Sequence, residues 1–263
     1  QKIKIGHVEA GLRSYNLYSP YPEEANRKLT GVLTNFHFAP TSSNRDNLLR
    51  EGYDEKNIFI TGNTVIDALK YTIKDDYKFK DEVLRKIDFD NKKVILLTSH
   101  RRENIGEKME NIFRGIKRAV EEVEDAVVVF PVHLNPKVRE IANRVFKEDD
   151  DIHLIEPLEY EPFTNLMARS FIVVTDSGGL QEEAPALGKP VLVIRDETER
   201  PEGIIAGTAK LVGTEEENVY LNLKELLTNE EQYTKMAKAI NPYGDGKASE
   251  RIVDILLEKL SIW

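Results

Sequence analysis

The sequence predicts an α/β fold made of two doubly wound parallel-sheet domains, the first of which is incomplete. Apolar runs of strand length alternate with longer segments of helical period throughout the 263 residues, as expected for parallel βαβ units. Three strand-length runs precede the charged segment 74–93, and six follow it. Six parallel strands with interleaved helices make a complete doubly wound domain, whereas three make about half of one. A half sheet would leave an unpaired apolar edge, which native proteins avoid.

The first part of the chain contains three predicted strands and three predicted helices. The strands are residues 3–8, 35–39 and 57–61, and the helices are residues 22–33, 41–52 and 65–73. The first helix begins near Pro22, whose fixed φ suits an N-terminal turn. The second is bounded by Thr41 as N-cap and by Gly52 at its end. Because segment 74–93 has little apolar pattern, we place the domain boundary between about residues 64 and 90.

The second part contains six predicted strands, and helical segments separate them. The strands are residues 94–98, 126–132, 152–155, 171–175, 191–194 and 209–212. The helix after the first of these carries its apolar residues at core-facing spacing: Met109, Ile112, Phe113, Ile116, Val120 and Val123. Further helices are predicted at residues 136–146 and 163–168, after Gly179, and at 249–260.

The composition argues against several kinds of partner, cofactor and location. A formal charge of −9 and a pI of about 5.3 argue against binding to a nucleic-acid backbone. The absence of cysteine excludes disulfides and thiolate metal sites and favours a cytoplasmic location. We expect no metal, because the histidines lack ligand spacing. We also expect no nicotinamide cofactor, because the sequence has no G-x-G-x-x-G fingerprint. No apolar run is long enough to predict a membrane span.

Polar residues gather where the predicted strands end. In parallel sheets, ligands bind beyond the carboxyl ends of the strands, so these residues are the candidates for a site. They are His7, Glu9, His100 to Glu103, His133, Asn135, Glu156, Asp176 to Gly179, Arg195, Asp196, Glu199 and Arg200. The repetition at one end of the sheet predicts a functional crevice there.

The turn at residues 176–179 is the strongest single motif. Gly178 and Gly179 let the backbone approach a ligand closely, and the helix that follows supplies amide donors and a positive dipole end. These features predict a cradle for a nucleotide phosphate, and Glu182 or Glu183 would accept hydrogen bonds from neighbouring sugar hydroxyls. Taken alone, the same stretch is equally compatible with an ordinary tight βα turn.

One histidine, His100, is a candidate for proton transfer in the predicted crevice. His100 follows a strand and is able to exchange a proton near pH 7. Arg101 and Arg102 beside it match phosphate oxygens, although a histidine packed at a strand end is the alternative. We interpret His133 and His153 as structural and His37 as a core residue.

Glu9 and Glu23 come from two separate segments and would act as acid and base if both face one cleft. The alternative for Glu23 and its neighbour Glu24 is that they complement the helix dipole.

Taken together, these segments resemble the non-hydrolysing UDP-N-acetylglucosamine 2-epimerases. The matching motifs lie at residues 6–13, 18–27, 59–67, 100–103, 131–136, 175–185, 195–201 and 241–246. The resemblance implies two Rossmann-like domains of the glycosyltransferase GT-B type with the active site between them. It divides the chain into an N-terminal domain at residues 1–66, a UDP-binding domain at 67–245 and a final helix at 246–263 that returns to the N-terminal domain.

The resemblance also implies roles for individual residues. Catalytic positions match Glu9, Glu23 and His100. Substrate-binding positions match Ser177, Gly178 and Gly179 for the diphosphate, Glu183 for the ribose and Phe163 near the uracil, with Arg101 and Arg102 in the crevice. Family members begin with a longer N-terminal stretch than this chain has, so either the chain is a fragment or a separate N-terminal polypeptide is its partner. The other expected partners are the UDP-sugar substrate and a second copy in a homodimer.

The reaction we expect is C2 epimerisation by elimination and re-addition of UDP, serving polysaccharide biosynthesis. The C2 hydrogen is barely acidic, and loss of UDP from C1 makes its removal feasible. Two alternatives remain open. One is a UDP-sugar glycosyltransferase of the same architecture, and the other is an inactive UDP-sugar-binding fragment that needs the N-terminal polypeptide.

Overall fold

The computed structural model describes residues 3–18, 21–147 and 149–260. The chain divides into two compact units, with Gln1–Tyr71 and Asn241–Trp263 in unit 1 and Thr72–Ile240 in unit 2. The boundaries expected from the sequence, after residues 66 and 245, lie inside helix α3 (Thr64–Thr72) and just before helix α11 (Ala248–Leu260). Each unit is described separately.

Unit 2 is a doubly wound domain, which confirms the predicted fold class. Its six strands are β4 (Lys93–Thr98), β5 (Ala126–Pro131), β6 (Ile152–Ile155), β7 (Ile172–Thr175), β8 (Val191–Val193) and β9 (Ala209–Leu211). They form one parallel sheet in the order β6-β5-β4-β7-β8-β9. The chain therefore builds outward from β4 in one direction and then from β7 in the other. A crevice for a ligand is expected where these two directions meet.

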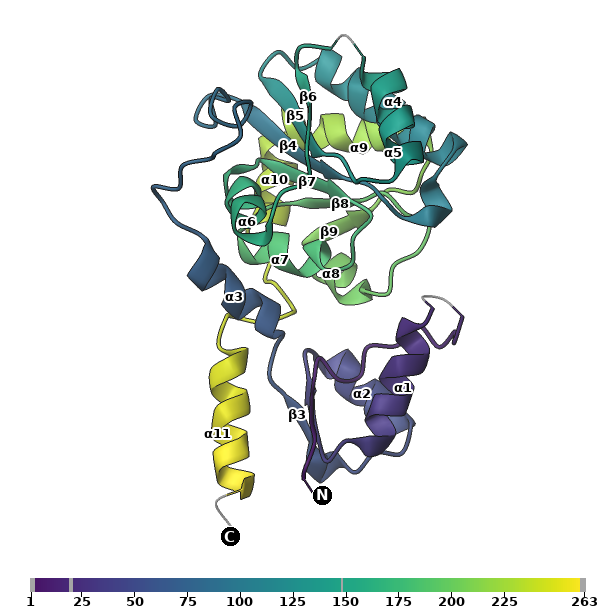
Figure 1. The fold of residues 1–263 in the computed structure, drawn as a ribbon, viewed down its shortest axis with the longest axis vertical. Coiled ribbons are helices and arrows are strands. Elements are labelled where there is room, and N and C mark those ends of the chain that lie inside the picture. Colours follow the sequence, from purple (N-terminus) through teal and green to yellow (C-terminus); the bar gives the residue numbers. More distant parts are fainter. Residues whose placement is uncertain (1–2, 19–20, 148, 261–263) are drawn as a thin grey trace. The chain divides into compact units, whose positions relative to one another are not determined.

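Helices cover both faces of this sheet (Figure 1). They are α4 (Glu107–Glu121), α5 (Pro136–Phe146), α6 (Tyr160–Arg169), α7 (Leu180–Ala186), α8 (Pro201–Ala206), α9 (Glu216–Thr228) and α10 (Glu230–Ala237), with the short 3-10 helix η2 (Arg102–Asn104). Alternate strand residues such as Ile95 and Leu97 join the core under α4, α5 and α9. At Gly115 in α4, a Cβ would lie 2.5 Å from the Glu216 carbonyl oxygen, so glycine is what allows α4 and α9 to pack this closely.

Unit 1 holds a three-stranded parallel sheet in the order β1-β2-β3. Its elements are β1 (Gly6–Val8), α1 (Glu23–Leu33), β2 (Phe36–Ala39), α2 (Ser42–Arg50), the 3-10 helix η1 (Glu55–Asn57), β3 (Ile58–Ile60), α3 and α11. The predicted strand at residues 3–8 is shorter in the structure. Its ladder begins only at the pair Gly6–Phe36, and just before it the Ile5 N–H donates to the Asn35 side chain at 2.9 Å instead of to a backbone carbonyl of β2.

The start of α11 is fixed to α3 within unit 1. The Asp67 carboxylate accepts the backbone N–H groups of Ala248 at 3.1 Å and Ser249 at 2.6 Å. These are donors that a helix start otherwise leaves unsatisfied. Further along α11, Ile252 packs with Phe36 and Phe38 of β2 in one cluster. The last helix therefore contributes to the apolar cover of the small sheet.

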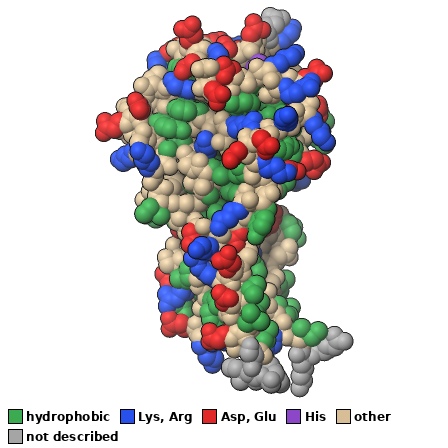
Figure 2. Space-filling view, turned by 90° about the vertical axis from the view of Figure 1, so that its left-hand side faces the viewer, with side chains coloured by type: hydrophobic (Ala, Val, Ile, Leu, Met, Phe, Trp, Pro, Cys, Tyr) green, Lys and Arg blue, Asp and Glu red, His purple; other side chains and the backbone are tan. Residues whose placement is uncertain are grey.

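Charged side chains of both signs lie intermixed on the face drawn in Figure 2. Intermixed charge gives little long-range attraction for a polyanion. Among the helices described, none is long and apolar enough to cross a bilayer.

Candidate functional site

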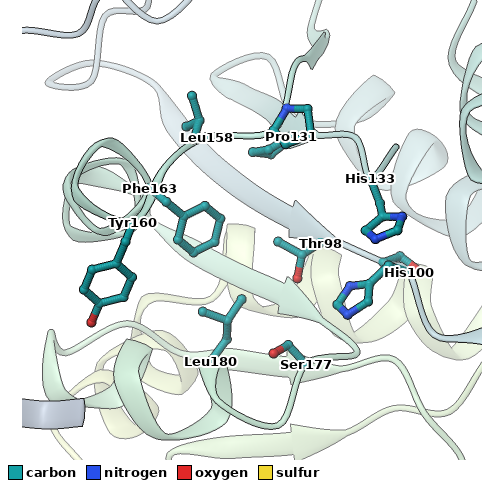
Figure 3. A pocket seen from close by; sticks show the side chains of 11 residues that line it. Thr98, His100, Pro131, His133, Leu158, Tyr160, Phe163, Ser177 and Leu180 are labelled. Carbon is teal, nitrogen blue, oxygen red and sulfur yellow. The ribbon is translucent and has the colours of Figure 1, made fainter. Parts of the chain in front are cut away.

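A cavity of about 400 Å³ opens in unit 2 at the carboxyl ends of β4, β5 and β7 (Figure 3). It is lined by Thr98, Ser99, His100, Pro131, His133, Pro157, Leu158, Tyr160, Phe163, Ser177 and Leu180. In the view of Figure 3, two rings from α6, Tyr160 and Phe163, lie on one side and the two histidines lie on the other. One end of the cavity is thus aromatic and the other polar, and its volume suits a small-molecule ligand.

Asp176, the first residue after β7, fixes the loop that carries His100. Its carboxylate is fully buried, and Oδ2 accepts the backbone N–H groups of His100 and Arg101, each at 2.9 Å. The side chains of Ser99 and Asn104 also donate to Oδ2, at 3.2 and 3.3 Å. A charged acceptor shared by several donors is a strong anchor, so the path of the chain beyond β4 is set by a residue at the end of β7.

The rings of His100 and His133 stack in the cavity wall, with centroids 5.4 Å apart and planes 16° from parallel. The backbone N–H of Asn135 donates to Nδ1 of His133 at 3.1 Å, which leaves the proton of that neutral ring on Nε2. Sequence reasoning set His133 aside as structural, and the structure places it in the wall of the cavity.

The turn between β7 and α7 is held by hydroxyl groups and by a buried arginine. The Ser177 N–H donates to Thr175 Oγ1 at 2.9 Å, and that oxygen lies 2.6 Å from Thr98 Oγ1. At Gly178, a Cβ would lie 2.5 Å from Nη1 of Arg200. Glycine is required here because the Arg200 guanidinium occupies the space of a side chain.

A cluster of ion pairs surrounds Glu199 beneath this turn. Guanidinium nitrogens of Arg101, Arg195 and Arg200 lie 3.1, 2.6 and 3.1 Å from its carboxylate oxygens. Burial opposes ionisation of Glu199, yet the nearby Arg195 and Arg200 lower its pKa to about 2. Arg101 also donates from Nε to the Asp176 carbonyl at 2.9 Å. It therefore supports the loop, whereas the side chain of Arg102 is exposed.

Two adjacent glutamates of α7 have different partners. Glu182 lies 2.6 Å from Nε of Arg200 and is buried with it, so it belongs to the ion-pair cluster. Glu183 is also buried, and its Oε2 accepts the Tyr160 hydroxyl at 3.2 Å. Burial raises the pKa of Glu183 to about 7, and burial, with Glu183 beside it, raises the pKa of Tyr160 to about 12. Of the two glutamates, Glu183 is the one adjoining the cavity, through Tyr160.

The raised pKa of Glu183 predicts a pH-dependent stability. The folded chain binds this proton more tightly than the unfolded chain, whose carboxyl titrates near 4.5. The contribution to stability is therefore fully present below about pH 4.5 and is lost as the pH rises through about 7. A shift of this size amounts to at most about 3 kcal/mol.

We expect the free energy of unfolding of the original chain, relative to a Glu183→Gln variant, to fall by about 1–3 kcal/mol between pH 4.5 and 7.5. Urea unfolding at both pH values measures this difference. Comparison with Glu183→Gln cancels the titration of other groups such as His37, whose pKa burial lowers to about 4. A difference that stays constant with pH would contradict the prediction.

The candidate carboxylates of unit 1 lie directly after strand β1 and at the first residue of helix α1. Glu9 directly follows β1 and has a φ of 63°, a left-handed conformation that non-glycine residues rarely adopt and that clusters at functional sites. Glu23 is the first residue of α1 and is exposed. Glu24 is fully buried and accepts the backbone N–H groups of Ser14 and Tyr15, each at 3.1 Å. The structure thus separates a structural Glu24 from a solvent-facing Glu23.

Sequence reasoning missed the roles of Asp176, Tyr160 and Arg200. A signal existed for Tyr160, since it precedes Phe163 by three residues and so lies on the same side of a helix. For Asp176 and Arg200 the partners are between 18 and about 76 residues away in sequence. Within the described ranges, no cluster of three or more potential metal-ligating side chains is present.

Comparisons with known proteins agree on one family. The family model described as UDP-N-acetylglucosamine 2-epimerase matches residues 1–257. A UDP-N-acetylglucosamine 2-epimerase of Bacillus subtilis is 59% identical over 97% of this chain, which spans 66% of that relative.

Solved structures are similar over nearly the whole chain. A Staphylococcus aureus protein solved with UDP has a TM-score of 0.93 and 52% identity, covering 100% of this chain and 71% of its own. A UDP-GlcNAc 2-epimerase of Neisseria meningitidis bound to UDP-GlcNAc has a TM-score of 0.87 and 50% identity, covering 98% of this chain and 70% of its own. The chain thus spans about two thirds of the length of these relatives.

Proposed function

The chain belongs to the UDP-N-acetylglucosamine 2-epimerase family, and from that premise we propose that it is an isomerase that interconverts UDP-N-acetylglucosamine and UDP-N-acetylmannosamine. The observation that carries the proposal is the match to a relative bound to UDP-GlcNAc at 50% identity over 98% of this chain. Sequence similarity at this level over nearly the whole length supports a shared reaction as well as a shared fold.

The cavity of unit 2 is the proposed site for the UDP moiety. Phe163, with the apolar Leu158 and Pro131 nearby, offers a surface on which the uracil ring stacks. The buried Glu183 is proposed to contact the ribose. The turn between β7 and α7 is proposed to hold the diphosphate through the backbone amides of Gly178 and Gly179 and the Ser177 hydroxyl, and His100 is proposed to donate a hydrogen bond to it. The polar and aromatic ends of the cavity support this orientation.

The proposed reaction breaks and re-forms the bond between C1 and the diphosphate. The C1–O bond breaks, its electron pair leaves with UDP, and a base removes the C2 proton as a C1–C2 double bond forms. UDP then adds back to this 2-acetamidoglucal while a proton is delivered to the opposite face of C2. Glu9 and Glu23 are proposed as the groups that move these protons. Support comes from the conformation of Glu9 and the exposure of Glu23.

Isotope exchange tests this scheme. In deuterated buffer, each epimerised product molecule is expected to carry solvent deuterium at C2, and 2-acetamidoglucal and UDP are expected to appear transiently in single-turnover mixtures. Mass spectrometry and NMR of the product measure both. Epimerised product without deuterium at C2 would rule out elimination and re-addition.

Two further measurements test the proposed partners, which are a second copy of the chain and an N-terminal polypeptide. We propose that the chain acts as a homodimer in the cytoplasm, which the absence of cysteine supports for the location. A rise in turnover on adding a polypeptide that carries the N-terminal third of a relative would support the further proposal of an N-terminal partner. Light scattering at assay concentration tests the dimer.

A further inference from the structure

The two oxygens of the buried Asp176 carboxylate differ in their surroundings. Oδ2 accepts from the His100 and Arg101 backbones and from the Ser99 and Asn104 side chains. Oδ1 accepts no hydrogen bond from any residue in the described part of the chain, although it is buried. Because buried polar atoms are almost always paired, an unpaired carboxylate oxygen next to a ligand cavity calls for a functional explanation.

Nδ1 of His100 lies 3.5 Å from this oxygen and is the potential donor that faces it. This distance is longer than a normal hydrogen bond. The backbone of His100 is already held by Oδ2, so a small rotation of the half-exposed imidazole is sufficient to close the gap. The stacked ring of His133 limits that rotation, since Asn135 holds His133 in place.

We propose that Asp176 is the positioning residue of His100: its Oδ1 accepts the Nδ1–H of His100 when a nucleoside diphosphate occupies the cavity. The imidazole would then be protonated on both nitrogens, and the Nε2–H, remote from Asp176, would donate a hydrogen bond to the ligand. Figure 3 shows the His100 ring extending from the end of β4 toward Ser177, where the diphosphate is proposed to bind. The inference rests on the proposed function for the identity of the ligand, while the carboxylate–imidazole geometry stands without it.

This arrangement gives Oδ1 of Asp176 a hydrogen-bond donor, so that each of the two carboxylate oxygens has its own role. Through Oδ2, Asp176 sets the position of the His100 backbone. Through Oδ1, it holds a proton on Nδ1 while Nε2–H donates to the anionic ligand. A carboxylate also stabilises positive charge on the ring while the diphosphate leaves from C1.

An Asp176→Asn variant separates the two tasks. Four donors converge on the position of Oδ2, so the amide is expected to place its oxygen there and its NH₂ group toward His100. Because NH₂ is a donor, Nδ1 must then be unprotonated to face it. The variant therefore keeps the loop anchor and leaves a neutral ring whose single proton is on Nε2.

Nitrogen-15 NMR of labelled histidine, with a His100→Ala variant to assign the signal, measures this in the UDP complex. We expect a protonated Nδ1 in the original chain and an unprotonated Nδ1 in Asp176→Asn. The matched control is Ser99→Ala, which removes one donor to Oδ2 and leaves Oδ1 unchanged, so it should retain a protonated Nδ1.

Three results would overturn the proposal. They are an unprotonated Nδ1 in the original chain with UDP, the same Nδ1 state in Asp176→Asn as in the original chain, or a Ser99→Ala spectrum like that of Asp176→Asn. The first does not depend on Asp176→Asn, so the proposal is testable even if that variant fails to fold.

A kinetic measurement connects the ring to the reaction. In Asp176→Asn, kcat for epimerisation is expected to fall at least about 100-fold while KM stays within about threefold, since a neutral ring stabilises the departing diphosphate less than a charged ring does. A raised KM with unchanged kcat would contradict the positioning role. If the original chain shows no epimerase activity but has the expected Nδ1 state, the result would count against the proposed function alone.

Discussion

Replacing Glu9 by glutamine is expected to lower the rate of C2 proton exchange by about 10³-fold, within the range that general acid–base groups contribute. An amide has nearly the size of the carboxylate but neither accepts nor releases a proton at neutral pH. The left-handed backbone at this position, with its φ of 63°, is retained in the variant because the change affects only the end of the side chain. Deuterium incorporation at C2 measures the rate directly.

The control for this experiment is Glu258→Gln, which changes an exposed carboxylate near the end of α11. Its exchange rate should equal that of the original chain, and calorimetric binding of UDP should agree within about twofold in both variants. Exchange in Glu9→Gln within threefold of the original rate would remove Glu9 from the proposed mechanism. It would also reopen the possibility of a glycosyltransferase, for which C2 exchange is not part of the reaction.

Replacing Glu182 by alanine is expected to lower the free energy of unfolding by about 3 kcal/mol. Glu182 and Arg200 are both buried, and their charged groups lie 2.6 Å apart. Removing the Glu182 carboxylate leaves the buried Arg200 guanidinium without one of its counter-charges. The value lies at the lower end of the usual range because Glu199 still faces Arg200 at 3.1 Å.

An exposed ion pair gives the matched comparison. Lys74 and Glu161 are linked at 2.5 Å in the same unit, but each side chain is about half exposed. Glu161→Ala is therefore expected to cost less than about 1 kcal/mol. Urea unfolding of the two variants at pH 7 measures both values, and equal losses would show that burial does not set the strength of the Glu182–Arg200 pair.

Much of the fold follows from local pattern. The predicted strands at 94–98 and 152–155 appear as β4 and β6 with at most one residue of difference, because buried parallel strands read as short continuous apolar runs. The core position of His37 was also predictable, since it stands between two phenylalanines. At the turn of residues 176–179 the glycine pattern predicted a close approach of the backbone to a ligand, which stays a prediction; the structure shows the Arg200 guanidinium beside Gly178.

What the sequence left open depends on contacts between distant segments. Nothing in the order of residues tells that Arg200 occupies the space beside Gly178, or that Asp176 holds the loop of His100. Likewise Glu23 and Glu24 are adjacent and alike in sequence. Only the fold makes Glu24 an acceptor for Ser14 and Tyr15 and leaves Glu23 at the surface. Such choices are made by packing and hydrogen bonding across the fold, which local periodicity does not encode.

The tie between Asp67 and the start of α11 has a consequence for the order in which the chain acquires its structure. Domains generally fold as units while the ribosome extends the chain, and α11 emerges only after the whole of unit 2 has been made. Until then, Phe36 and Phe38 lack the helix that shields them from water. The larger unit, continuous in sequence, is thus able to complete its core first, and the smaller one closes last around its late-arriving helix.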